Sequence, residues 1–342
     1  MSRPPLLSVV IPVYNRGEVI RHTLESVRRA SAGLDVETIV VDDGSDEPIA
    51  PVIDRLGYSP ARLIRQTNKG LLFARLAGLS AATGRYLLFL DSDDLVSEAK
   101  FRLQTAAMLE AQADVSYTDQ ARCTLAGDFD ALTFEPEPAL RNTGEAADFY
   151  INIQPAPHNP VFRTDYLRHT VAQAYFPPSR LYNPVAEIWF YHNAAPRPGR
   201  IIRVPGPHTI IGNHPGVRLT SNWERMAIAS LAVMEAFVRT VPDSSQTATA
   251  RRLVGEVAFR SWRGLPRGFS PTFEERELQI TRRLAPGYSG GSGGGLFKLA
   301  SLCLGRERAG RLSRRIRGKS YSSCRTLSDG DVARQLAQLP PP

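Results

Sequence analysis

Three carboxylates stand within four residues, at Asp91, Asp93 and Asp94, directly after the apolar run 86–90. Carboxylates that follow a buried strand lose hydration and repel one another, so they need a cation or strong hydrogen bonds beside them. A divalent cation such as Mn²⁺ or Mg²⁺, held by these carboxylates and by diphosphate oxygens, would relieve the repulsion. The alternative is an acidic N-cap for the following helix. The spacing alone leaves both interpretations open.

Polar clusters also follow two earlier apolar runs. Tyr14 and Asn15 directly follow the apolar run 8–13. The segment 42–45, Asp-Asp-Gly-Ser, directly follows the apolar run 38–41. In a parallel α/β sheet the carboxyl ends of the strands line the ligand crevice. We therefore expect three loops that are far apart in sequence to converge on one site.

The elements that must position these loops follow from the spacing of apolar residues. Short runs rich in Val and Ile predict strands, and apolar residues three and four apart predict helices. The pattern weakens through a proline-rich and aromatic-rich stretch at 134–160. The predicted strands are 8–13, 38–41, 63–64, 86–90, 115–117 and 201–204, and the predicted helices are one carrying Ile20, Leu24 and Val27, then 71–82, 98–111, 185–195 and 220–241, with further helix up to residue 283.

Four sequence blocks occur in an order that resembles the family 2 glycosyltransferases of the GT-A fold. They are Val-Val-Ile-Pro-Val-Tyr-Asn at 9–15, Val-Val-Asp-Asp-Gly-Ser at 40–45, Asn68-x-Gly70 with Arg75 and Gly78, and Leu-Phe-Leu-Asp-Ser-Asp-Asp at 88–94. The resemblance is clear over 7–96 and weaker up to about residue 214. It implies a Rossmann-like α/β domain with a mixed, mainly parallel sheet flanked by helices, followed by a helical C-terminal extension.

The resemblance also implies a nucleotide-sugar site with a divalent cation, Mn²⁺ or Mg²⁺. His214, within Asn-His-Pro-Gly at 213–216, would lie near the metal or diphosphate, and a solvent-facing turn is the alternative for it. For Gly78 the alternative is tight helix packing. The implied donor-site residues are Pro12, Tyr14, Asn15, Asp43, Asn68, Arg75 and Asp91, and the implied metal ligands are Asp91, Asp93 and His214.

A transferase also needs a base that takes the proton of the acceptor hydroxyl. The family places this acid before an aromatic helix, and Glu187, followed by Ile188 and Trp189, stands at the matching position. The sequence departs from the family here, because a single glutamate replaces the usual Glu-Asp pair. An ordinary helical glutamate is therefore the alternative. The aromatic residues at 189–191 could stack on an acceptor sugar or fill the core.

With these roles the reaction is a direct displacement that inverts the anomeric carbon. The resemblance implies UDP as the carrier, with GDP and dTDP as alternatives, a hydroxyl of a glycan or lipid-linked acceptor, and bacterial cell-surface polysaccharide synthesis. Two other functions stay open. A sugar nucleotidyltransferase would need a glycine-rich basic loop after the first strand, which 12–16 lacks. A catalytically inactive relative that binds nucleotide-sugar or glycan is favoured by the altered motif at Glu187.

The charge of the chain is distributed unevenly. The 342 residues are 42% hydrophobic and carry a net charge of +8, and the segment 296–325 alone holds nine basic residues and one acidic residue. Leucines and Phe297 followed by an arginine-rich run predict an amphipathic segment on an anionic membrane surface, or else a solvated, disordered tail. The arginine-rich segment has no aromatic residues between its arginines and no pattern of a known nucleic-acid-binding fold. We therefore do not expect a nucleic-acid partner.

The domain organisation follows from these composition shifts. We expect a catalytic domain at 1–220, a helical extension at 221–286, a Gly/Ser linker at 287–295 and a basic, membrane-surface tail at 296–342. A membrane span of about eighteen apolar residues and a signal-peptide pattern are both missing, so we expect a cytoplasmic location, peripheral at the inner face of the plasma membrane. Cys123, Cys303 and Cys324 fit neither a zinc motif nor a disulfide framework.

Overall fold

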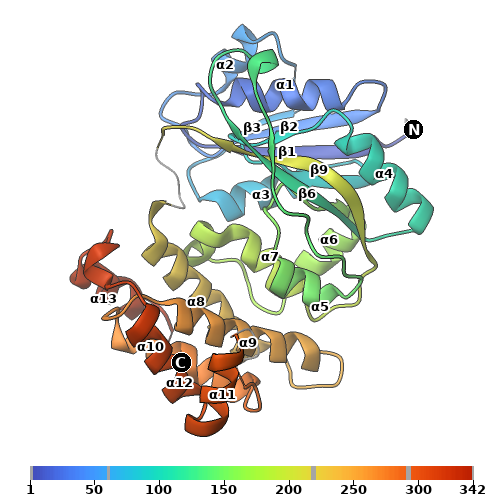
Figure 1. Cartoon of the computed structure of the whole chain (residues 1–342). Helices are drawn as coiled ribbons and strands as arrows, with labels where there is room; N and C mark the ends of the chain where they lie inside the picture. Colours follow the sequence, from blue (N-terminus) through green and yellow to red (C-terminus); the bar gives the residue numbers. More distant parts are fainter. Residues whose placement is uncertain (1–2, 60–61, 217–220, 290–293, 341–342) are drawn as a thin grey trace.

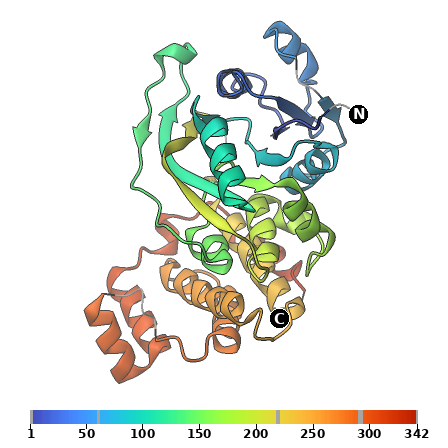
Figure 2. The ribbon, with the colours of Figure 1, turned by 90° about the vertical axis from the view of Figure 1, so that its right-hand side faces the viewer.

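The computed structural model of the protein describes residues 3–59, 62–216, 221–289 and 294–340. An α/β region contains the sheet, and a helical region lies below it in the view of Figure 1. Figure 2 shows the same ribbon from the side, where the last helices project from the edge of the helical region.

The described strands form one nine-stranded mixed sheet. They are β1 (Leu7–Val13), β2 (Val36–Asp42), β3 (Arg62–Arg65), β4 (Tyr86–Phe89), β5 (Leu95–Val96), β6 (Val115–Thr124), β7 (Glu135–Pro136), β8 (Val161–Arg163) and β9 (Ile201–Asn213). Their order is β3-β2-β1-β4-β8-β6-β9-β5, with β7 paired to β6. The first four strands of this order run parallel, β8 is antiparallel to β4 and β6, and β9 is parallel to β6. The predicted mixed α/β sheet is confirmed.

Helices cover both faces of this sheet (Figure 1). They are α1 (Ile20–Ala30), α2 (Ala50–Arg55), α3 (Leu71–Ala81), α4 (Lys100–Ala111), α5 (Ala146–Asp148), α6 (Thr164–Ala172) and α7 (Ala186–Ala194). Val9 of β1 belongs to a hydrophobic cluster with α1 and α4, whereas its neighbour Val10 belongs to another with α3 and α7. Successive strand residues point to opposite faces, so an unbroken Val/Ile run suits a strand that is buried on both.

The predicted helical extension is present. It consists of α8 (Trp223–Thr240), α9 (Ala248–Gly264) and α10 (Pro271–Leu284). Their buried apolar residues join the same hydrophobic cluster as α3 and α7, so the extension and one face of the sheet share a core. Glu235 of α8 and Arg276 of α10 form a buried ion pair at 2.5 Å. A carboxylate and a guanidinium that are both buried need such a partner.

The segment after residue 294 differs from the predicted tail. It forms α11 (Gly295–Leu304), α12 (Arg306–Arg317) and α13 (Asp329–Ala337). Arg314 of α12 is buried and donates to Glu274 of α10 at 2.6 Å, and Leu336 of α13 joins the shared core. The segment is held because α10 supplies the Glu274 carboxylate and α9 supplies the Trp262 ring beside Arg314, neither of which the basic run could reveal. The middle of the predicted linker, 290–293, lies outside the described residues.

Most predicted elements lie where the periodicity places them. The strands expected at 115–117 and 201–204 are longer, because β6 and β9 pair in parallel from Val115 to Thr124. β8 and α6, after the proline-rich stretch, were not predicted. In the described part of the chain, no helix combines the length and apolarity that crossing a bilayer requires.

Candidate active site

Side-chain hydrogen bonds join the loops that follow β1 and β2. Nδ2 of Asn15 donates to Asp46 at 2.9 Å, and the Asp46 N–H donates back to Oδ1 of Asn15 at 2.9 Å. The Asn15 N–H also donates to Oγ of Ser45 at 3.0 Å. Pro12 is buried within β1, whereas the Tyr14 ring is 47% exposed. The two loops are therefore fixed together, with the Tyr14 ring open to a ligand.

Asp43 is buried just after β2 and orders the loop that leads into α3. Its carboxylate accepts hydrogen bonds from the Gln66 side chain at 2.7 Å, the Lys69 N–H at 3.0 Å and the Gly70 N–H at 2.7 Å. Asn68 is exposed within that loop. The structure thus brings Asp43 and Asn68, both predicted donor-site residues, to the same loop cluster.

The start of α3 depends on Asn183, which the sequence analysis missed. Asn183 accepts from the Leu72 N–H at 3.1 Å and donates to the Lys69 carbonyl at 3.0 Å. Gly70 has φ 95°, and a Cβ there would lie 1.9 Å from Nδ2 of Asn183. Gly70 is therefore required by backbone conformation and by close approach. Asn183 lies in the 3₁₀ segment Arg180–Val185 before α7, and no local pattern links it to α3.

Arg75 of α3 connects the carboxylate loop after β4 with the candidate base. Its side chain is buried, Nη2 donates to Oδ1 of Asp91 at 2.6 Å, and Nη1 lies 3.5 Å from Oε2 of Glu187. Burial alone would lower the pKa of Arg75, but the charges of Asp91 and Glu187 raise the pKa above its ordinary value. The guanidinium therefore stays charged between two carboxylates.

Glu187 stands in the first turn of α7, and its side chain is 24% exposed. Burial raises the pKa of Glu187 above its ordinary value, while the charge of Arg75 opposes that rise. A partly exposed carboxylate with a raised pKa is suited to accept a proton near neutral pH. The predicted base thus lies in contact with a predicted donor-site residue.

The aromatic residues after Glu187 are part of the core. Trp189, Phe190 and Tyr191 are all buried. Nε1 of Trp189 donates to the Phe176 carbonyl at 3.2 Å, and the ring centroids of Phe190 and Phe89 are 5.2 Å apart. Of the two interpretations of this stretch, core packing is the one observed, because the three rings are buried and leave no surface for a sugar.

Asp93 and His214 are in contact although 121 positions separate them. Nε2 of His214 lies 2.9 Å from Oδ2 of Asp93. Burial, together with the charges of Asp94 and Asp91, raises the pKa of Asp93. A cation beside Asp93 would therefore be favoured, because it would stabilise the ionised carboxylate.

Asp94 explains how β9 brings His214 to the carboxylates. Its Oδ1 accepts from the Gly212 N–H at 2.8 Å, and its Oδ2 lies 2.9 Å from Nδ1 of His158. A Cβ on Gly212 would lie 2.0 Å from the Asp93 carbonyl oxygen. The alternative of an acidic N-cap is not observed, because α4 begins after Ala99 with no side-chain cap.

Protein groups alone assemble the predicted metal site only in part. Asp93 touches His214, whereas the Asp91 carboxylate is engaged by Arg75. Nowhere in the described ranges do three His, Cys, Asp or Glu side chains form a group that could hold an ion by themselves. Mg²⁺ at phosphate sites is commonly bound through one or two carboxylates plus substrate phosphates and water. The Asp93–His214 pair fits a metal that takes its remaining ligands from a bound diphosphate.

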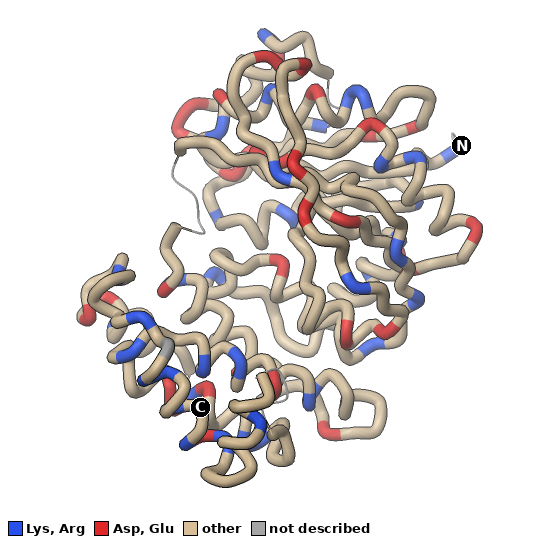
Figure 3. Tube along the Cα trace, viewed as in Figure 1, with Lys and Arg blue, Asp and Glu red and all other residues tan. Residues whose placement is uncertain are grey.

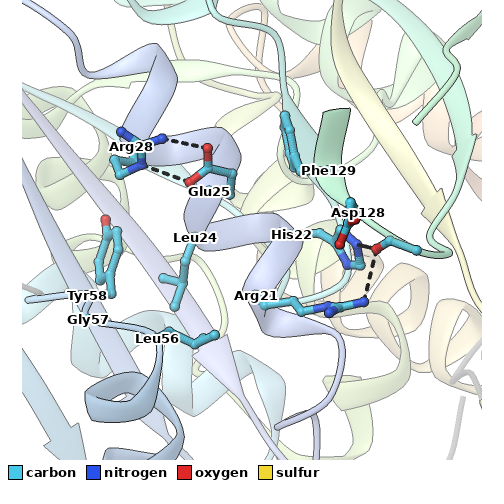
Figure 4. Close-up of a pocket in the computed structure, with 11 residues that line it drawn as sticks. Arg21, His22, Leu24, Glu25, Arg28, Leu56, Gly57, Tyr58, Asp128 and Phe129 are labelled. Atoms are coloured by element: carbon cyan, nitrogen blue, oxygen red, sulfur yellow. Dashed lines mark hydrogen bonds and ion pairs between the residues drawn. The ribbon is translucent and has the colours of Figure 1, made fainter. Parts of the chain in front are cut away.

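A cavity of about 250 Å³ lies elsewhere, along α1 (Figure 4). It is lined by α1 residues and by the turns at 56–58 and 127–129. Within it, Arg21 donates to the Gly127 carbonyl at 3.0 Å and Arg28 pairs with Glu25 at 2.6 Å. The described residues that line this cavity include none of the predicted site residues, so it is separate from the candidate site.

Sequence comparisons agree with the resemblance. The family described as Glycosyl transferase family 2 matches residues 8–170. The uncharacterized glycosyltransferase EpsJ of Bacillus subtilis is 35% identical over 113 residues, which cover 32% of this chain and 33% of that protein. The glycosyltransferase GlyG of Streptococcus pneumoniae is 34% identical over 113 residues, covering 32% and 37%. The chain spans about a third of the length of these curated relatives.

Solved structures share the fold. The crystal structure of Staphylococcus aureus TarS 1–349 in complex with UDP-GlcNAc has a TM-score of 0.65 and 16% identity, covering 91% of each chain. The mannosyltransferase PcManGT from Pyrobaculum calidifontis, in complex with GDP-Man and Mn²⁺, has a TM-score of 0.56 and 15% identity, covering 98% of this chain and 88% of that one. At these identities the likeness concerns the fold. Residues 8–170 thus match glycosyl transferase family 2, and the chain has the GT-A fold.

Proposed function

We propose that the protein is an inverting glycosyltransferase, which transfers a sugar from a nucleoside-diphosphate donor to a hydroxyl of a glycan or lipid-linked acceptor. The observation that carries the proposal is the position of Arg75, which contacts Asp91 on one side and Glu187 on the other. One buried cation thereby holds a donor-site acid and the candidate base at the same place. This arrangement is what a displacement between a bound donor and an acceptor hydroxyl needs.

In this proposal the first three loops bind the donor. Tyr14 and Asn15 with Asp43 hold the base and ribose, and Asp91 contacts the ribose. Asp93 and His214 hold Mn²⁺ or Mg²⁺, which when bound neutralises charge on the leaving diphosphate. The remaining predicted donor residues, Pro12 and Asn68, shape the floor and the rim of the site.

Glu187 serves the acceptor side, and Arg75 links it to Asp91 on the donor side. Glu187 accepts the proton of the acceptor hydroxyl while that oxygen attacks the anomeric carbon opposite the leaving group, so the configuration inverts. Arg75 stabilises the ionised form of Glu187, because its positive charge opposes the effect of burial on the pKa. Arg75 is thus a positioning residue for the base.

UDP is the first carrier to test, and GDP is the second. UDP follows from the family resemblance and is the carrier bound in the TarS structure, whereas GDP-Man is bound in the PcManGT structure. We also propose a role in bacterial cell-surface polysaccharide synthesis, at an anionic membrane surface. Residues 1–220 would form the catalytic domain, and the helices from residue 221 onward would support it.

Thermal stabilisation by nucleotides tests the donor site. The protein is heated with UDP, GDP or dTDP, each with and without Mn²⁺. A ligand that binds the native state at a hundred times its dissociation constant stabilises it by about 2.7 kcal/mol. We expect a shift for one nucleotide that requires Mn²⁺ and is lost in Asp93→Ala. Asp54→Ala, an exposed aspartate of α2, is the matched control and should keep the shift. The absence of a shift with every nucleotide would refute the donor site.

A further inference from the structure

Helix α11 packs one side against the protein and turns leucines to solvent on the other side. Phe297 and Ser301 point inward, with Phe297 lying over the Arg263 guanidinium at 4.3 Å. Leu296, Leu299 and Leu302, spaced three apart, are 78%, 60% and 78% exposed. A helix at the surface of a globular protein normally turns charged residues to solvent. The outer face of α11 is therefore an apolar surface that no described residue of the chain covers.

Helix α12 continues the same two-helix hairpin and adds positive charge. Gly305, with φ 77°, joins α11 to α12, and the two helices pack against each other. Leu312 and Ile316 of α12 are also exposed, at 43% and 72%. Figure 3 shows Lys and Arg residues gathered on these last helices. The exposed cations of the hairpin and its end are Lys298, Arg308, Arg311, Arg315 and Lys319.

Three further charged side chains of the hairpin are engaged with the protein body. Arg314 is buried against Glu274, and Arg306 donates to the Ala285 carbonyl at 2.6 Å. Glu307, the one acid in the sequence of 295–317, pairs with Arg282 at 2.6 Å. The outward side of the hairpin therefore presents leucines and cations without an exposed acid to balance them.

We propose that the α11–α12 hairpin docks the protein on an anionic lipid bilayer. The leucines of α11 would enter the boundary between headgroups and acyl chains, and the exposed cations would lie among anionic headgroups. Its ten residues give α11 a length of about 15 Å, half the hydrocarbon thickness, so it lies on the membrane. The proposal deepens the proposed function, on which it rests for the acceptor, since a membrane surface is where a lipid-linked acceptor is found.

Charge favours a lipid surface over a second copy of this chain. Pairing two such hairpins would bring their exposed cations together, and like charges at an interface disfavour association. An anionic bilayer instead provides negatively charged headgroups for the cations and an apolar environment for the leucines. Each cation near an anionic surface contributes about a fivefold gain in partition coefficient, which falls as salt screens the charges.

Flotation with lipid vesicles tests the hairpin in the full chain. Vesicles of phosphatidylcholine alone are compared with vesicles that also contain phosphatidylglycerol, at low and high salt. We expect the protein to float with the anionic vesicles only, and less so at high salt. Two triple variants, Leu296/Leu299/Leu302→Ser and Arg308/Arg311/Arg315→Gln, should each bind at least roughly tenfold more weakly. Leu109→Ser and Arg102→Gln, both exposed on α4, are matched controls that should float normally.

A reporter on Cys303 locates the contact. Cys303 is exposed, Cys123 is buried and Cys324 is replaced by Ser, so a polarity-sensitive dye labels α11 selectively. Its emission should shift to the blue with anionic vesicles. No flotation of the unsubstituted protein, flotation that the hairpin variants retain, or self-association through the leucines in sedimentation would each overturn the proposal. Nucleotide stabilisation of the hairpin variants is measured alongside, so loss of lipid binding and loss of the donor site are distinguished.

Discussion

Nη1 of Arg75 lies 3.5 Å from Oε2 of Glu187, so helices α3 and α7 meet at an ion pair inside the candidate site. The same guanidinium is hydrogen-bonded to Asp91. In the proposed mechanism, the donor side and the acceptor side of the site therefore share one buried cation. Substitution of Arg75 should change stability, the pH dependence of activity and donor binding together, whereas substitution of Glu187 should change the chemistry alone.

Arg75→Met should destabilise the protein by about 2 kcal/mol or more, because two carboxylates lose their cation. This loss of stability should be smaller than the loss expected for two fully buried carboxylates, since the side chains of Asp91 and Glu187 are 23% and 24% exposed. Arg75→Lys keeps the positive charge and should therefore lose less stability than Arg75→Met. Urea unfolding of the three proteins measures this difference, and equal losses in both variants would contradict a role for the charge.

The acid limb of the pH profile should also depend on Arg75. Glu187 must be ionised to act as a base, so kcat/KM should fall as pH decreases through its pKa. Arg75 lowers that pKa against the effect of burial, so its removal should raise the pKa further. The acid limb of the kcat/KM profile should therefore lie at higher pH in Arg75→Met than in the unsubstituted protein. In Arg75→Lys the acid limb should shift by a smaller amount. An acid limb that stays in place would argue that another group accepts the proton.

Glu187→Gln separates an enzyme from an inactive binding protein. It removes the proton acceptor and nearly preserves shape, so transfer or donor hydrolysis should fall by about 10²–10⁴-fold. Nucleotide-dependent thermal stabilisation should stay. Glu145→Gln, an exposed glutamate before α5, is the control that should retain activity. A wild-type protein that binds nucleotide but neither transfers nor hydrolyses a donor would instead support the inactive relative.

Gly78→Ala should destabilise the fold through packing. A Cβ at Gly78 would lie 2.1 Å from Cγ1 of Val10, where α3 crosses β1. Overpacking of this kind costs about 1–3 kcal/mol. Val10→Ala in the same chain should recover part of that loss, which a double-mutant cycle measures by urea unfolding. Gly264→Ala, which meets no atom within 4 Å, should have little effect, and an equal loss there would refute the packing explanation.

Glu277 makes the stability of the fold decrease as the pH rises toward 8. Burial raises the pKa of Glu277 to about 8. A carboxyl whose pKa is higher in the folded than in the unfolded state stabilises the fold at low pH, and that contribution is lost as pH rises from about 4.5 to about 8. Glu277→Gln should thus stabilise the protein above pH 8 by at least about 1 kcal/mol. Urea unfolding across pH measures this, and a gain of the same size at pH 4 would contradict the titration.

The sequence by itself determined the main strands and the polar loops that follow them. β1, β2 and β4 and the polar loops after them could be predicted, because burial on both faces leaves an unbroken run of Val, Ile and Leu. The loops around Asn15 and Asp43, and the carboxylates at 91–94, could be expected at one edge of the sheet because they stand at strand ends. Their roles toward a donor came only from the family resemblance. The contact of Asp93 with His214 was anticipated only through a family resemblance.

Only the tertiary structure decided which of these side chains meet. Arg75 reaches Glu187, and Asn183 fits against Gly70, because the packing of α3 and α7 brings distant segments within hydrogen-bonding range. The sequence predicts a tail after residue 294, since it shows the basic charge but not that Glu274 of α10 pairs with Arg314. Local periodicity reports which face of an element is buried. The partner on that face is set by how the elements pack, and that depends on the whole chain at once.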